Sequence, residues 1–201
     1  MHLYKKFLPI LVCCTFLFAE KYNIYIWSIP VAQVEMINNP GEVHFKTKSI
    51  GLLNYIWPHK NSYSTVYNTD NFGLRKYSKN IKQGDFTQEL TWEYNIGDST
   101  LVFDDTKTAI TDSIQTIFTL LARIALESYE YFDTKWFPVD HESCAYKGRF
   151  LWSDTVSVPV LNKKVLCDHF RLDLIKVEQE KCDIEESDYF MENIIDPNSI
   201  R

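Results

Sequence analysis

The sequence has no apolar run of the about 20 residues that cross a bilayer, and only six of its 201 residues are glycine. So little glycine leaves no phosphate-cradling loop, and the G-x-S-x-G, H-E-x-x-H and paired C-x-x-C motifs are also absent. These absences point away from the enzyme classes that such motifs mark. We therefore expect a non-enzymatic protein with no cofactor and no transmembrane segment.

The N-terminus has the pattern of a secretory signal. Lys5 and Lys6 precede a mostly apolar stretch over 7–18, and Ala19 is a small residue before Glu20. We expect residues 1–19 to be cleaved and residues 20–201 to form a single domain in the periplasm or cell envelope. Lipid attachment at Cys14 is the alternative.

The charge balance disfavours a nucleic-acid partner. Removing residues 1–19 takes away Lys5 and Lys6 and no acidic residue, so the net charge moves from -6 to -8. An acidic surface repels phosphate backbones. The densest basic segment, residues 75–82, alternates with apolar residues as one face of a strand would, and no basic cluster compensates for the acidic residues.

Three cysteines remain after cleavage: Cys144, Cys167 and Cys182. An odd number permits at most one internal disulfide and leaves one thiol over. Their separations do not match the spacing of metal ligands, so we expect no metal site.

Alternation of apolar and polar residues dominates the chain. Residues 20–36 form two alternating stretches around Pro30, which marks the turn or a bulge of a first hairpin because proline cannot donate to a strand ladder. Further strands are predicted at 42–50, 52–57, 63–68, 72–81, 86–94, 100–103, 136–139, 144–152, 156–160 and 165–177, with a turn at 161–164.

One segment has helical periodicity instead. Residues 112–128 place Ile117, Phe118 and Leu121 on one apolar stripe, and Asp112 with Gln115 can form a capping box. The stripe needs an apolar partner, which a curled sheet supplies. The sequence therefore predicts a mainly β fold: a curled antiparallel sheet or open β-barrel packed on a single amphipathic helix.

Aromatic residues are frequent on the predicted strands, which leaves two hypotheses for function. In the first, an apolar or lipid-like ligand lies between sheet and helix against Trp57, Trp92, Phe118 and Leu121. In the second, the core is fully packed and the protein is a structural or protein-interaction module of the envelope, whose partner meets an exposed edge or an acidic face. The two differ in cavity volume, since a ligand site needs about 300 Å³ or more.

The acidic and histidine-containing segments indicate surface loops. Residues 140–142, Asp-His-Glu, could ligate a metal or move a proton, and Asp104 and Asp105 could also move a proton, but no nucleophile accompanies them. A hydrolase is therefore the third and weakest hypothesis. The acidic run at 182–188 lacks the glycine and spacing of a calcium loop and is predicted to be solvated.

The order of these segments resembles a known family. The opening YNIYIWSIPVAQVEM, the strands FGLRKYSKN and FTQELTWEYN, the strand LVFDD, the helix SIQTIFTLLARIAL and the later SVPVLNKKVLCDHFRLDLIKV are similar to the bacterial envelope family catalogued as domain of unknown function 3108. The resemblance implies an envelope location and this fold, but no activity. It also implies a further C-terminal strand, so we expect the chain to be truncated, with one sheet edge left unpaired.

Overall fold

The computed structural model describes residues 19–103, 106–160, 163–177 and 187–196. Residues 1–18 of the predicted signal segment 1–19, Asp104, Asp105, Cys182 and the acidic residues up to 186 lie outside these ranges. Within them, no helix is long and apolar enough to cross a membrane.

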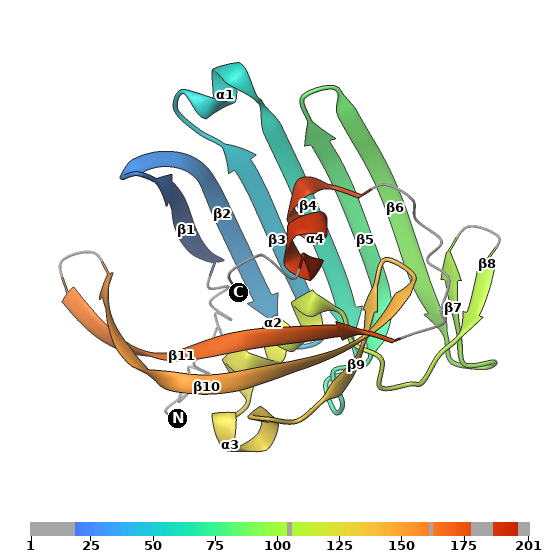
Figure 1. Ribbon diagram of the computed structural model, residues 1–201. Coiled ribbons are helices and arrows are strands. Elements are labelled where there is room, and N and C mark those ends of the chain that lie inside the picture. Colours follow the sequence, from blue (N-terminus) through green and yellow to red (C-terminus); the bar gives the residue numbers. More distant parts are fainter. Residues whose placement is uncertain (1–18, 104–105, 161–162, 178–186, 197–201) are drawn as a thin grey trace, which may run out of the picture.

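The larger of two antiparallel sheets contains eight strands in sequence order. It is an open meander with β1 and β8 at its edges (Figure 1). Its strands are β1 (Ala19–Ile26), β2 (Ile29–Asn39), β3 (Glu42–Ser49), β4 (His59–Tyr67), β5 (Leu74–Gln83), β6 (Phe86–Asn95), β7 (Thr100–Phe103) and β8 (Thr106–Ala109). The mainly β fold with an unclosed antiparallel sheet is therefore confirmed, and β8 is a strand that the sequence analysis did not predict.

The smaller sheet has the order β11-β10-β9. It consists of β9 (Phe137–His141) and a long hairpin of β10 (Cys144–Val160) and β11 (Lys163–Lys176). The separate strands predicted at 144–152 and 156–160 form one continuous strand, β10. A register shift between Trp152 and Asp154 leaves Ser153 as an extra residue within it. This bulge interrupts the alternation in the sequence without ending the strand.

The first hairpin is confirmed, and Pro30 lies at a bulge rather than in the turn. Tyr25 pairs with Pro30 whereas Ile24 pairs with Ala32, so Val31 is the extra residue. The turn itself is Trp27-Ser28, where both residues have positive φ. Two such residues form the turn type whose twist matches that of the flanking strands.

The strand predicted at 52–57 is wrong. These residues form a short helical turn, α1 (Leu53–Ile56), that connects β3 to β4. Their apolar side chains do not enter the core, since Leu52, Tyr55 and Ile56 are all exposed. Apolar content alone therefore did not identify a buried strand here.

The predicted helix is present as α2 (Ile117–Leu126) and starts later than expected. Its capping box uses Thr116 and Thr119, each accepting a hydrogen bond from the backbone N–H of the other. Asp112 instead pairs with Arg75 at 2.8 Å. The capping box predicted from Asp112 and Gln115 is thus wrong, because a tertiary ion pair engages Asp112.

Three short helices accompany α2: α1, α3 (Tyr129–Phe132) and α4 (Tyr189–Ile195). α4 follows the acidic run, and its N-cap Asp188 accepts hydrogen bonds from the backbone N–H groups of Phe190 and Met191. Asp188 is buried, so the prediction of a solvated loop at 182–188 is wrong at this residue. Burial also contradicts the solvated loop predicted for Asp140, His141 and Glu142.

The core lies on both sides of α2. One cluster of buried side chains fills the space between the large sheet, α2 and α4, and includes Tyr77, Trp92 and Phe118. The other includes Leu120 and Phe150 and lies between α2 and the small sheet. Figure 1 shows the β10–β11 hairpin crossing the lower part of the large sheet, with α2 between them and α4 over β3 and β4. On the opposite face of the large sheet, Lys46, Lys48, Lys60 and Lys82 are exposed.

A disulfide at Cys144 is consistent with the sequence, whose three remaining cysteines permit at most one internal disulfide. Cys144 is disulfide-bonded, and Cys167 is free and half-buried. The partner of Cys144 lies outside the described residues.

Candidate functional site

The four residues predicted to line a ligand site do not all lie together. Trp92 and Phe118 are fully buried, and Leu121 is half-buried between the two core clusters. Trp57 lies apart from them, with its ring 5.6 Å from His59 and 5.7 Å from Tyr189. The structure therefore brings Trp92 and Phe118 into the same cluster and separates Trp57 from it.

Aromatic rings occupy the space between α2 and the large sheet. The ring centroid of Phe118 lies 5.0 Å from Tyr63, 5.1 Å from Phe45 and 5.8 Å from Tyr77. Tyr77 in turn contacts Trp92 at 5.0 Å. These separations are those of packed aromatic pairs. We call the set Phe45, Tyr63, Tyr77, Trp92 and Phe118 the aromatic cluster; it fills the region where the sequence placed a ligand.

A buried polar cluster lies beside these rings. Lys79 of β5, whose side chain is fully buried, forms ion pairs with Glu142 of the β9–β10 turn and with Asp188 at the start of α4. The Lys79 Nζ to Asp188 Oδ2 distance is 3.4 Å, and Ser187 Oγ lies 3.2 Å from the same nitrogen. Ser187 also donates a hydrogen bond to Glu142. Lys79, Glu142, Ser187 and Asp188 form the polar cluster, which joins three segments distant in sequence.

A hydrogen bond joins the two clusters: the hydroxyl of Tyr63 donates to Asp188 Oδ1 at 2.7 Å. The indole N–H of Trp92 donates to Ser143 Oγ, next to Glu142 in the β9–β10 turn, at 2.8 Å. Burial, reinforced by the negative charge of Asp188, raises the pKa of Tyr63. Its hydroxyl therefore stays protonated and acts as a donor.

Burial also shifts the pKa of Glu142 in the β9–β10 turn and of His141, the last residue of β9. It raises the pKa of Glu142, although the neighbouring Lys79 opposes this effect. It lowers the pKa of His141 to about 4, and the positive charge of Lys79 acts in the same direction. His141 also forms a hydrogen bond with the backbone of Met191 in α4. The imidazole is thus held neutral while it contacts the helix.

Glu142 and Ser143 both have positive φ, which is unusual for residues other than glycine and asparagine. They form the two-residue turn between β9 and β10, and a turn of this type requires positive φ at both positions. The ion pair of Glu142 and the hydrogen bond to Ser143 hold the strained backbone in place. The turn is thus fixed by tertiary contacts rather than by the asparagine and glycine that usually signal it.

The polar cluster has the arrangement of a structural connection. The ammonium group of Lys79 donates to two carboxylates, and Ser187 donates to one of them, Glu142. Among the described residues, no group of three His, Cys, Asp or Glu side chains could hold a metal ion. The cluster joins β5, the β9–β10 turn and α4.

One part of the polar cluster had a signal in the sequence. Strand alternation places Lys79 on the same face as Tyr77 and Ile81, both of which are buried. A lysine between two buried apolar residues indicates a buried charge that needs a partner. Nothing in the sequence, however, identifies Glu142 and Asp188 as the acidic partners of Lys79.

Comparison with known proteins adds no further constraint. The chain matches no family model, no curated protein and no solved structure, so the resemblance to the envelope family stays a prediction.

Proposed function

We propose that the protein is an exported, non-enzymatic module of the cell envelope that has a closed core and acts through its surface. The observation that carries this proposal is the aromatic cluster. Phe118 and Trp92 are 1% and 0% exposed, and their ring neighbours occupy the region where an acyl chain would lie. This packing favours an interaction module over a protein that holds a lipid-like ligand between sheet and helix.

Two features support export. The first is the signal pattern of Lys5, Lys6 and the apolar stretch that ends at Ala19. The second is the disulfide of Cys144, since disulfides persist in oxidising compartments and are rare in the cytosol. Sequencing of the mature protein from the envelope fraction tests this part: its first residue should be Glu20. A cytoplasmic chain with Met1 intact, or a diacylated Cys14, would contradict it.

The edge strand β1 is the surface best suited to a protein partner. Within the described residues β1 pairs with β2 alone. Ile24, Tyr25, Ile26 and Trp27 are all exposed on this strand and its turn, Trp27 to 93%. Unpaired backbone groups beside exposed apolar side chains can accept an added strand from another protein.

A fluorescent fatty acid tests the closed core. We expect no saturable binding to the purified mature protein and no dependence on chain length. If a ligand were held inside, each added methylene would contribute about 0.8 kcal/mol until the cavity was full. Saturable binding that tightens with chain length, together with a change in tryptophan emission, would favour the ligand-holding alternative.

Photo-crosslinking tests the edge. A benzoylphenylalanine at Tyr25 should give a discrete crosslinked product in cells that export the full chain. Tyr131 in α3 is the matched control, because it is another tyrosine of similar exposure, 65% against 58% for Tyr25. Equal products at both positions, or none at Tyr25, would remove the support for a partner at this edge.

A further inference from the structure

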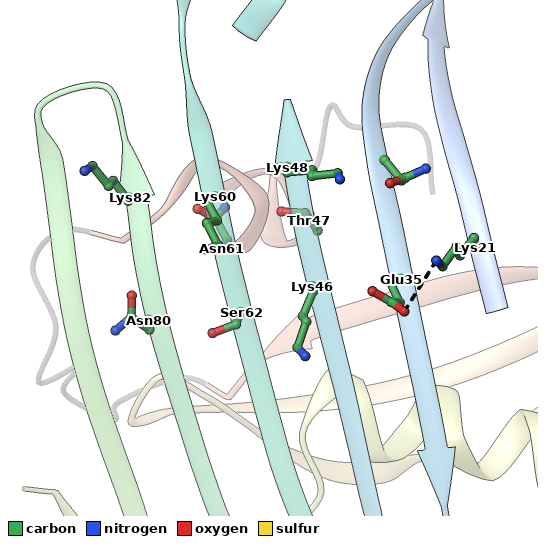
Figure 2. Close-up of a pocket in the computed structure, with 11 residues that line it drawn as sticks. Lys21, Glu35, Lys46, Thr47, Lys48, Lys60, Asn61, Ser62, Asn80 and Lys82 are labelled. Atoms are coloured by element: carbon green, nitrogen blue, oxygen red, sulfur yellow. Dashed lines mark ion pairs between the residues drawn. The ribbon is translucent and has the colours of Figure 1, made fainter. Parts of the chain in front are cut away.

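The solvent-facing side of the large sheet contains a hollow of about 640 Å³. Figure 2 shows it on the sheet face opposite to α2 and the small sheet, which lie behind the strands in this view. Five lysines line it: Lys21, Lys46, Lys48, Lys60 and Lys82, which we call the lysine face. The remaining lining residues are Glu35, Gln33, Thr47, Asn61, Ser62 and Asn80, so only one of them is acidic.

Strand register places three of these lysines in one row. Lys48 pairs with Lys60 across β3 and β4, and Lys60 pairs with Lys82 across β4 and β5. Neighbouring strands lie about 4.8 Å apart, and like charges directly opposite each other destabilise a sheet. The row therefore opposes folding, and another role is needed to explain it.

The lysine face has little internal neutralisation. Lys21 lies 3.9 Å from Glu35. In the ranges that the structure covers, no carboxylate lies within 4.0 Å of the ammonium groups of Lys46, Lys48, Lys60 and Lys82. The whole chain has a net charge of -6. The expectation that no basic cluster exists is thus wrong, because separate strands bring together lysines that are scattered in the sequence.

Protection of a sheet edge does not explain the row. Lysines on edge strands hinder edge-to-edge aggregation. The row instead lies on β3, β4 and β5, each of which is paired on both sides. Its side chains project from the face of the sheet and not from an edge.

We infer that the lysine face binds a compact anion with several charges, of the class of phosphorylated sugars and polyols. Lysine ammonium groups bind phosphate as point charges, and Ser62 and Asn80 supply groups that can hydrogen-bond to hydroxyls. The volume falls within the range of about 300–1,000 Å³ that small-molecule sites occupy.

The shape and lining of the hollow favour this ligand over larger polyanions. No aromatic side chain of the described residues lines it, whereas sites for single-stranded nucleic acid combine basic groups with rings on which bases stack. The side chains at the bottom of a hollow are also poorly accessible to the flat surface of a bilayer. This inference concerns the sheet face and does not depend on the partner proposed for β1.

Titration of the mature protein with myo-inositol hexakisphosphate tests the site. We expect saturable 1:1 binding that weakens as salt is raised. Lys60→Ala removes the middle charge of the row and should weaken binding about tenfold, the loss expected for one charge-assisted hydrogen bond. Lys147→Ala removes an exposed lysine of β10 and changes the net charge equally, so it should bind within about twofold of the wild type.

Stability provides a second readout. If the row is kept for binding, Lys60→Ala should melt no lower than the wild type without ligand, because it relieves repulsion from Lys48 and Lys82. Non-saturating binding, equal weakening by Lys147→Ala, or a lower melting temperature for Lys60→Ala would overturn the inference. So would tight binding to phosphatidylglycerol vesicles or to a single-stranded oligonucleotide without binding of the hexakisphosphate.

Discussion

Lys79 and Glu142 form a buried ion pair that connects β5 of the large sheet to the β9–β10 turn of the small sheet. Their side chains are 0% and 4% exposed. Asp188, also fully buried, adds a second carboxylate from the start of α4. The pair thus lies where both sheets and the C-terminal helix meet, so its loss affects the docking of all three.

Replacing Lys79 should destabilise the protein strongly. Lys79→Met leaves the carboxylates of Glu142 and Asp188 buried without their cation, and breaking a buried pair in this way costs about 3–5 kcal/mol. Urea denaturation measures the change in the free energy of unfolding. Lys82→Met, three residues along the same strand but exposed, should change it by no more than about 0.5 kcal/mol.

A double variant separates the loss of the ion pair from a loss of packing. Glu142→Gln added to Lys79→Met removes one of the uncompensated charges and should recover part of the lost stability. If the two substitutions were simply additive, or if Lys79→Met and Lys82→Met had equal effects, the ion pair would not be the connection that we describe.

Stability should fall as the pH is lowered from about 6.5 towards 4. An unfolded histidine titrates near 6.5, whereas burial lowers the pKa of His141 to about 4. In this window the unfolded state binds a proton that the folded state does not, so stability is lost by up to about 1.4 kcal/mol per pH unit. Glu142 acts in the opposite direction, because its raised pKa favours the folded state at low pH.

The slope of stability against pH isolates the contribution of His141. Urea midpoints measured at several pH values should decline less steeply in His141→Gln than in the wild type. His169→Gln is the control, since it makes the same substitution at an exposed histidine. An unaltered slope in His141→Gln would mean that this imidazole titrates normally.

Most of the strands followed from the sequence because each buries one face. Alternation located β3, β5, β6 and β7 to within two residues and missed the first four residues of β4; where it succeeded, it reflects burial that any pairing partner would satisfy. It failed at residues 52–57, where apolar residues are exposed in α1. It also could not reveal the bulge at Ser153, because a register shift depends on the partner strand.

The polar cluster and the lysine face were missed for a related reason. Glu142 and Asp188 seemed to belong to solvated acidic loops because their cation, Lys79, lies 63 and 109 residues away. Similarly, Lys48, Lys60 and Lys82 form a row only after the register of three strands is known. Both features arise from tertiary pairing, which a local pattern does not contain.

The disulfide gives a third prediction. Cys144→Ala should lower the free energy of unfolding by about 2–5 kcal/mol, as expected for loss of a native bridge. Cys167→Ala should have a much smaller effect, because Cys167 is free. Thermal melts with and without a reductant measure this effect. The reductant should lower the melting temperature of the wild type and of Cys167→Ala, and it should leave the melting temperature of Cys144→Ala unchanged. A wild type insensitive to reductant would contradict the bridge.

The last prediction concerns α2, which is buried on two sides. Phe118 faces the large sheet within the aromatic cluster, and Leu120 faces the small sheet. Phe118→Ala should cost about 3–5 kcal/mol and Leu120→Ala about 2–5 kcal/mol, because each leaves a cavity in a packed core. Leu126→Ala, on the same helix but 57% exposed, should cost little.

Leu121 distinguishes this two-sided burial from the single apolar stripe that the sequence predicted. Leu121 is only half-buried, whereas Leu120 is 0% exposed. A helix packed on one sheet alone would make Leu121→Ala more costly than Leu120→Ala, since the predicted stripe included Leu121 and not Leu120. We expect the reverse order in urea denaturation, because Leu120 fills the space between α2 and the small sheet.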